Sequence, residues 1–293
     1  MFEDENSYIE FLQTLRDKKI YPFPHKGSNG DTLIKFATSM LLEALGLEVV
    51  PAPRQADVIL WPGGNISMWR ANIKDLKTLI KASPDKQLVI GPAGFQPSVF
   101  TSQALIRDIS KVCTAIFSRE PDSYSYMQKC FSPYGVRVEL SHDPSLCLRK
   151  STWLQEQKRL SGEQYILACF RDDFESASFG NHIIRYMIQY LPFLPSLLLT
   201  KIISKITKER RLRKISSDCR SPAQVKKYNA AASDFDTYLS TIRNAKAVHT
   251  DRLHVMLLSA MLGKKTFAYR TAYNKLESVY SHSVSEFAEV ELV

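Results

Sequence analysis

Short apolar runs alternate with amphipathic stretches along most of this chain, and turns rich in Gly, Pro, Asn and Asp separate them. The apolar runs have the length of buried strands, and the amphipathic stretches have helical spacing. We expect strands at residues 20–23, 47–50, 58–61, 88–91, 115–118, 136–140, 165–170, 247–249 and 266–269. Helices fit between most of these strands, which predicts an α/β fold built on parallel sheets.

The densest pattern lies at residues 245–280. A short strand ends at His249, residues 253–262 form a helix that is apolar on every side, and Gly263 ends it. Such a helix must be buried. Thr250 or Asp251 is the expected N-cap. A second strand follows at once, which predicts a βαβ unit with parallel pairing and leaves the polar residues at its mouth.

Arg252 and His254 lie at that mouth, in the first turn of the predicted helix. Unpaired backbone N–H groups there favour an anion, and an arginine adds a planar fork that matches phosphate or carboxylate. A histidine adds a group that carries a proton near neutral pH. The alternative is that Arg252 pairs with Asp251 on the surface while His254 is a core histidine bonded to a carbonyl.

Two other strand ends carry candidate ligand-binding residues. The loop PHKGSNGD leads into a helix from Thr32, so its backbone N–H groups suit a charged or polyhydroxylated ligand. Asp31 could instead serve only as the N-cap. Arg171 follows the strand at 165–170 and is expected at the same sheet edge as Arg252.

Length and composition set the broad class. The 293 residues suffice for two domains, which we place at 1–150 and 151–293, joined by a polar helical stretch. The five cysteines lack metal-ligand spacing, so neither structural zinc nor a disulfide framework is expected. No apolar run is long enough for a spanning helix, and the first residues are acidic. We therefore expect a cytoplasmic protein.

The formal net charge of +9 is concentrated in residues 183–214, where apolar residues give way to clustered Lys and Arg. This pattern is typical of a segment that lies on an anionic membrane, and it predicts a peripheral protein on the inner face of the cell membrane. Nucleic acid is excluded as a partner because no module pattern accompanies the charge. A surface hairpin whose leucines pack back on the domain is the alternative. The tail after Tyr280 could cross back to the first half.

Several short motifs, taken in order and spacing, resemble the polysaccharide pyruvyl transferase family. They are Asn29-Gly30-Asp31, Gly63-Gly64, Ser118-Arg119-Glu120, His142-Asp143-Pro144, Phe170-Arg171-Asp172, Arg252-Leu253-His254 with Gly263, and Tyr273-Asn274-Lys275. The resemblance covers residues from about 20 to 280. It implies a GT-B-like pair of Rossmann-type domains facing a central cleft.

The resemblance also implies an activity: transfer of the enolpyruvyl group of phosphoenolpyruvate onto two hydroxyls of a sugar, giving a pyruvate ketal and phosphate. The acceptor would belong to a surface polysaccharide precursor, such as a polyprenyl-diphosphate-linked oligosaccharide. The implied donor-binding residues are Arg171, Arg252, Leu253, His254 and Lys275, and the implied acceptor-binding residues are Asn29, Asp31 and Asp143.

Within that chemistry, His254 is the implied acid, and the base is open among Asp31, Asp143 and Asp172, with Asp31 favoured. No metal or cofactor is expected, because the chemistry requires none. Two rival functions remain: a GT-B glycosyltransferase that uses a nucleotide sugar, and a non-catalytic protein that docks on membranes through residues 183–214.

Overall fold

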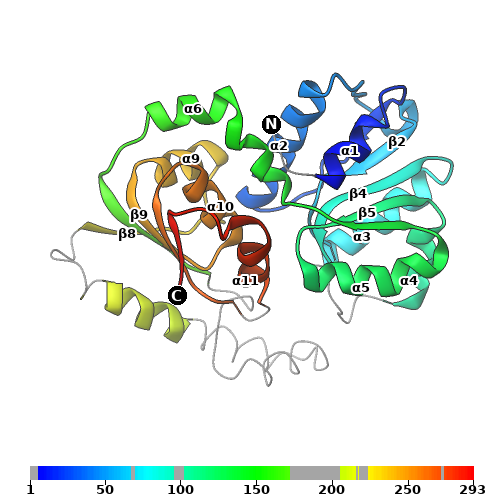
Figure 1. Ribbon diagram of the computed structural model, residues 1–293. Helices are drawn as coiled ribbons and strands as arrows, with labels where there is room; N and C mark the ends of the chain where they lie inside the picture. Colours follow the sequence, from blue (N-terminus) through cyan, green and yellow to red (C-terminus); the bar gives the residue numbers. More distant parts are fainter. Residues whose placement is uncertain are drawn as a thin grey trace. The chain divides into compact units, whose positions relative to one another are not determined.

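The computed structural model describes residues 6–66, 70–95, 102–171, 205–215, 217, 224–271 and 274–293. The chain forms two compact units (Figure 1). The first unit contains Met1–Gly27 and Asp31–Leu148, and the second contains Ser28–Gly30 and Arg149–Val293. Each unit is built on a parallel sheet, so the prediction of an α/β fold with two parallel sheets is confirmed.

The first unit holds the sheet order β1-β2-β4-β5-β6, with the short β3 beside β4. The strands are β1 (Ile20–Pro22), β2 (Val58–Trp61), β3 (Gly64–Asn65), β4 (Gln87–Gly94), β5 (Cys113–Ser118) and β6 (Arg137–Leu140). The helices are α1 (Ser7–Gln13), α2 (Asn29–Ala44), α3 (Arg70–Ala82), α4 (Gln103–Ser110) and α5 (Pro121–Phe131). Single 3-10 turns lie at Pro53–Gln55 and Ser132–Tyr134, and a longer one at Pro144–Lys150.

Helices cover both faces of this sheet, because alternate strand residues point to opposite sides. Ile59 and Trp61 of β2 belong to a core cluster with residues of α3, α4 and α5. Val58 and Leu60, which alternate with them along the strand, point to the other face and belong to a second cluster with residues of α1 and α2. The first unit is therefore a three-layer sandwich, and its strands read as continuous apolar runs because both faces are buried.

The second unit holds the parallel order β11-β10-β9-β7-β8. The strands are β7 (Tyr165–Cys169), β8 (Val225–Lys227), β9 (Ala245–Thr250), β10 (Lys265–Ala268) and β11 (Val290–Leu292). The helices are α6 (Thr152–Arg159), α9 (Phe235–Arg243), α10 (Leu253–Met261) and α11 (Lys275–Val279), followed by a π-helical turn at Tyr280–Val284. Residues 205–215 form a further helix.

The predicted βαβ unit is present as β9, α10 and β10, and Gly263 ends the helix with a φ of 74°. Two local predictions were wrong. The N-cap of α10 is Arg252, with no side-chain cap, because Thr250 and Asp251 bond to other groups. The chain's tail does not return to the first half, since Val290 pairs with Thr266 and β11 extends the second sheet.

Only part of the basic segment lies within the described residues. Positions 183–204 fall outside them. Leu212 and Ile215 of helix 205–215 are buried in one cluster with Ala168 and Phe170 of the second unit, so this helix packs through its apolar side. In the parts of the chain that the structure describes, no helix combines the length and hydropathy needed to cross a bilayer.

Candidate functional site

The carboxyl ends of β7 and β9 meet in the middle of the second sheet, because the two strands are parallel neighbours. Thr250, at the end of β9, ties them together: its hydroxyl donates to the carbonyl of Cys169 at 2.7 Å. The same oxygen accepts the backbone N–H of Arg252 at 3.0 Å. Thr250 is fully buried, so it fixes the backbone on which Arg252 stands. This is the sheet edge where ligands bind in open α/β folds.

Asp251 is the central acceptor at this edge. Its side chain has no exposed surface, and it accepts the backbone N–H of Arg171 at 2.7 Å and Nη1 of Arg211 at 2.8 Å. Burial raises the pKa of Asp251, and the arginines, Arg211 foremost, act in the opposite direction. The carboxylate therefore joins the end of β7 to helix 205–215. The alternative of a surface pair between Asp251 and Arg252 does not hold, because the Asp251 side chain is fully buried.

Arg211 was not singled out from the sequence as a site residue. It projects from helix 205–215, and besides Asp251 its guanidinium donates to the carbonyl of Arg270 at 3.2 Å. It also lies 4.8 Å from the ring centroid of Tyr269 and 5.3 Å from that of Phe170, within cation–π range. Read along the chain, it is one cation among many. Its distinguishing signal is its place beside Leu212, on the buried side of the helix.

Arg252 is the buried cation of the site. It is only 8 % exposed, and within the described residues its Nε has no hydrogen-bond partner. A buried guanidinium without an acceptor is costly unless an anion completes it. Arg171 is half-buried at the neighbouring strand end. Three arginines (171, 211 and 252) thus act electrostatically on one carboxylate among the described residues.

His254 lies half-buried in the first turn of α10, and Leu253 before it is buried. The backbone of Gly30 passes directly against the histidine: a Cβ built on Gly30 would lie 2.3 Å from Nδ1 and 3.1 Å from Cβ of His254. No side chain fits there unless the whole imidazole moves. The glycine of Asn29-Gly30-Asp31 is therefore explained by close packing on His254.

Asn29 also belongs to the second unit. Its Nδ2 donates to the carbonyls of Ala230 and Ser233, both at 2.8 Å. Asn29 was predicted to bind the acceptor; the structure gives its amide nitrogen an anchoring role for the segment Ser28–Gly30. Lys275, the remaining predicted cation, is half-buried at the first residue of α11.

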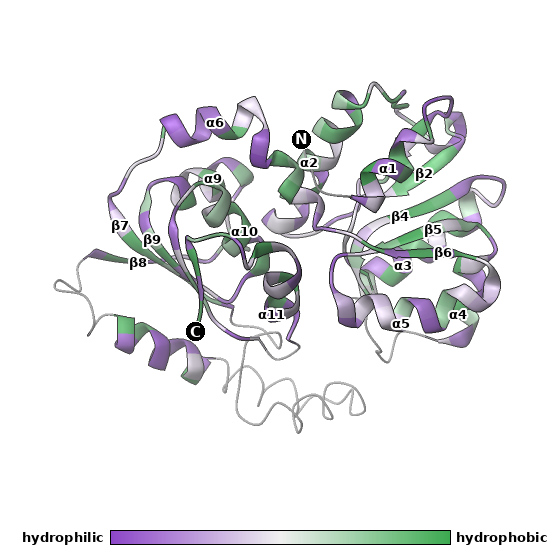
Figure 2. Cartoon of the chain, in the orientation of Figure 1, coloured by the Kyte–Doolittle hydropathy of each residue, from purple (hydrophilic) through white to green (hydrophobic). Residues whose placement is uncertain are grey.

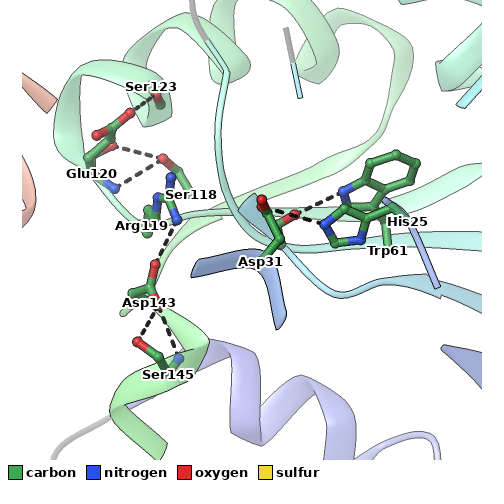
Figure 3. Close-up of polar contacts among 10 residues, drawn as sticks. His25, Asp31, Trp61, Ser118, Arg119, Glu120, Ser123, Asp143 and Ser145 are labelled. Atoms are coloured by element: carbon green, nitrogen blue, oxygen red, sulfur yellow. Dashed lines mark hydrogen bonds and ion pairs between the residues drawn. The ribbon is translucent and has the colours of Figure 1, made fainter. Parts of the chain in front are cut away.

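The first unit has its own polar group at the carboxyl ends of β1 and β2 (Figure 3). Oδ1 of Asp31 lies 3.7 Å from Nε2 of His25, and the His25 ring stacks on Trp61 with centroids 5.0 Å apart. His25 is 1 % exposed, whereas the Asp31 side chain is 22 % exposed. Gly64, with a φ of 96°, lets the backbone pass close to the carboxylate, since a Cβ there would lie 3.0 Å from Oδ1. Asp31 is thus the accessible member of a histidine–aspartate pair.

Asp143 lies elsewhere in the first unit and is fully buried. One oxygen accepts Nη1 of Arg119 at 2.7 Å, and the other accepts the hydroxyl of Ser145 at 2.7 Å and its backbone N–H at 3.0 Å (Figure 3). Asp143 was predicted to bind the acceptor. These contacts give it a structural role instead, because both oxygens are committed and no surface reaches solvent. Asp172, the third candidate base, lies outside the described residues. Among the described residues no cluster of His, Cys, Asp and Glu could hold a metal ion.

Two parallel sheets with helix N-termini and cations at their carboxyl ends define a Rossmann-type protein suited to ligand binding. The family model for polysaccharide pyruvyl transferase matches residues 2–273, and the chain belongs to this family of transferases. The resemblance seen in the motifs is thereby confirmed. A comparison with curated proteins finds no match.

Among solved structures, a functionally uncharacterised protein from Klebsiella pneumoniae subsp. pneumoniae NTUH-K2044 is similar in fold. It is 18 % identical with a TM-score of 0.64, and the match covers 100 % of this chain and 99 % of that one. Two structures of UDP-GlcNAc 2-epimerase from Methanocaldococcus jannaschii match more weakly. Their TM-scores are 0.40 and 0.36, at 11 % and 12 % identity, and the matches cover 92 % of this chain and 72 % and 71 % of theirs.

Proposed function

We propose that this polysaccharide pyruvyl transferase uses phosphoenolpyruvate as donor and forms a pyruvate ketal on two hydroxyls of a sugar in a surface polysaccharide precursor. The observation that carries the proposal is Arg252. Arg252 as a residue is 8 % exposed, and its Nε has no acceptor in the described residues, so its guanidinium is suited to a small, highly charged anion.

Phosphoenolpyruvate places a phosphate and a carboxylate on one three-carbon skeleton. Arg252 supplies one planar cation and the N-terminal N–H groups of α10 supply further donors. Arg171 lies at the adjacent strand end, where its backbone is held by Asp251. The arginine pair therefore fits the two anionic ends of the donor, and a lysine at either position would lose the bidentate geometry.

The reaction balances without a cofactor. A proton adds to the vinyl CH2, the carbon that bears the phosphate oxygen becomes oxocarbenium-like, and a sugar hydroxyl adds to it. The C–O bond to phosphate then breaks, and the second hydroxyl closes the ketal. Of the two hydroxyl protons released, one replaces the proton that made the methyl group and the other leaves on phosphate.

Two residues are assigned the proton transfers. His254, in the first turn of α10 beside Arg252, donates to the vinyl carbon. Asp31 of the first unit binds an acceptor hydroxyl and takes its proton, because it is the accessible carboxylate of its pair with His25. The acceptor is proposed to be a polyprenyl-diphosphate-linked oligosaccharide.

The test is incubation of the purified chain with phosphoenolpyruvate and lipid-linked sugars, with phosphate release and the mass of the acceptor as readouts. Arg252→Lys keeps the charge but loses the fork, and we expect kcat/KM to fall about 10- to 100-fold. Arg137→Lys is the matched control, since Arg137 is exposed and paired with Glu139 in the first unit. Undiminished phosphate release in Arg252→Lys would refute the donor site.

We also propose that the chain works as a peripheral protein on an anionic membrane. Helix 205–215 supports this, because Lys205, Arg210, Arg213 and Lys214 are exposed while Leu212 and Ile215 face the protein. Vesicles containing anionic lipid should bind the chain, and binding should weaken as salt rises. Replacing Arg213 and Lys214 by Gln should weaken it further. Equal binding to neutral vesicles would refute the claim that the exposed Lys and Arg residues drive membrane binding.

A further inference from the structure

A cavity that is open to solvent lies in the second unit, between α6 and α9, on residues that the donor site does not use. Its volume is about 460 Å³. This volume falls in the range of small-molecule sites, roughly 300–1,000 Å³. No residue of this cavity was singled out from the sequence.

Each helix contributes one face to the cavity. Trp153 and Gln157 are four residues apart on α6, and Asp236, Ser240 and Arg243 are spaced by four and three on α9, so each set lies on one side of its helix. Figure 2 shows α6 as largely hydrophilic, and Leu154 is the buried residue of this helix. The two helices therefore leave a groove with polar walls rather than an apolar contact.

The walls offer both donors and acceptors. Nη1 of Arg243 donates to Oε1 of Gln157 at 2.8 Å, while Nε of Arg243 is buried without a hydrogen-bond partner among the described residues. The hydroxyls of Thr237 and Ser240 donate to Asp234 and to a backbone carbonyl, which leaves their lone pairs as acceptors. Arg243 and Asp236 have opposite charge, so the cavity does not select strongly for an anion.

Trp153 and Leu239 add apolar surface to the same cavity. A ligand that fits all of these groups has an apolar face, a rim of groups that both donate and accept, and no net charge. A sugar ring has this chemistry, because its axial C–H bonds make one face apolar while its hydroxyls form a polar rim. An indole is a rigid platform for such a face at low entropic cost.

We propose that the cavity between α6 and α9 binds a sugar unit of the oligosaccharide acceptor, away from the sugar that receives the ketal. That the ligand is part of an oligosaccharide acceptor rests on the proposed function, whereas its identity as a sugar rests on the side chains that line the cavity. Such a subsite makes the enzyme prefer longer acceptors, because binding of a remote unit adds affinity without taking part in the reaction.

Direct binding tests the cavity without turnover. Ligand-detected NMR and calorimetry on the full chain would use methyl glycosides and β-linked disaccharides of glucose, galactose and N-acetylglucosamine, with no phosphoenolpyruvate present. At least one should bind, and Trp153→Ala should weaken it about tenfold or more. Asp236→Asn, on an exposed residue in the first turn of α9, should weaken it about threefold or more. Tyr134→Ala, an exposed aromatic of the first unit, should leave binding unchanged.

The proposal is overturned if none of these sugars binds, or if both cavity variants bind them as the parent does. It is also overturned if AMP, a ligand with an aromatic base and a phosphate, displaces the sugar from this cavity. Kinetics separate it from the donor chemistry. Trp153→Ala should raise KM for a long acceptor and leave KM for a monosaccharide acceptor and kcat unchanged. Sugar binding through Trp153 in a chain that releases no phosphate would refute the proposed function and leave the sugar site standing.

Discussion

Replacing Asp251 by alanine tests whether helix 205–215 is held at the sheet edge by one carboxylate. The change removes the acceptor of the Arg171 backbone N–H and of Arg211 Nη1. Leaving a buried N–H without an acceptor costs about 1–3 kcal/mol. Breaking a buried ion pair costs about 3–5 kcal/mol, although Arg211 is 13 % exposed and keeps the carbonyl of Arg270.

Part of this loss is returned, because burial raises the pKa of Asp251 and an ionised carboxylate in that place is itself costly. We therefore expect a net destabilisation of about 3 kcal/mol, below the roughly 4–8 kcal/mol to which the two costs would add without this compensation. The midpoint of thermal unfolding should fall by about 5–10 °C. Trypsin should also cleave within residues 205–215 sooner, since the helix loses its polar anchor.

Urea unfolding followed by circular dichroism measures the change, and a double-mutant cycle with Arg211→Met isolates the pair. The control is Glu48→Ala, which removes a pair with Lys19 whose side chains are 60 % and 53 % exposed, and which should cost less than about 1 kcal/mol. If Asp251→Ala costs no more than this control, Asp251 does not hold the helix and the account of the site is wrong.

Three further predictions concern other parts of the chain. Gly30→Ala should displace His254 and lower kcat about 100-fold with little effect on donor affinity, whereas Gly46→Ala, with no atom within 4 Å of the new Cβ, should leave kcat unchanged. His254→Ala should abolish ketal formation and leave the circular dichroism spectrum intact; full activity would remove His254 from the mechanism. Burial raises the pKa of Glu277, so stability is lost as the pH rises above the ordinary pKa of 4.5 and this carboxyl group ionises. Glu277→Gln should therefore raise Tm at neutral pH and leave Tm unchanged below pH 4.5.

Strands buried on both faces were predictable from the sequence, because a parallel sheet covered by helices needs continuous apolar runs. Residues 58–61 and 165–169 lie where their pattern places them. The strand expected at residues 47–50 is only an isolated bridge between Ile20 and Val49, and strands β8 and β11 were missed. Each has three residues, and Val225–Lys227 carries two lysines, so neither shows a period; each forms because a neighbouring edge is open to pairing.

The candidate site divides in the same way. Arg252 and His254 could be predicted as site residues from the sequence, because the end of the strand and the start of the helix around them lie within ten residues of each other. The partners that position them are remote: Arg211 and Asp251 are 40 residues apart, and Asn29 and Ala230 are 201 apart. Side-chain pairs at such separations have no periodic signal, and within the long basic stretch nothing in the sequence distinguishes Arg211, which is partly buried, from its exposed neighbours.

These remote partners share one physical effect: they take up the carboxylate of Asp251, and among the described residues Nε of Arg252 is left without a hydrogen-bond partner. Asp251 is adjacent in sequence and would be the simplest partner, yet its two oxygens are bound to Arg171 N–H and to Arg211. Thr250 holds the Arg252 backbone, so the side chain cannot relieve its burial by moving the main chain outward. Burying Nε of Arg252 without an acceptor costs the fold about 1–3 kcal/mol, and an anionic ligand that accepts its hydrogen bond would recover that energy on binding. The same cost explains why Arg252→Met should stabilise the free protein while removing donor affinity, an outcome that a merely structural arginine would not give.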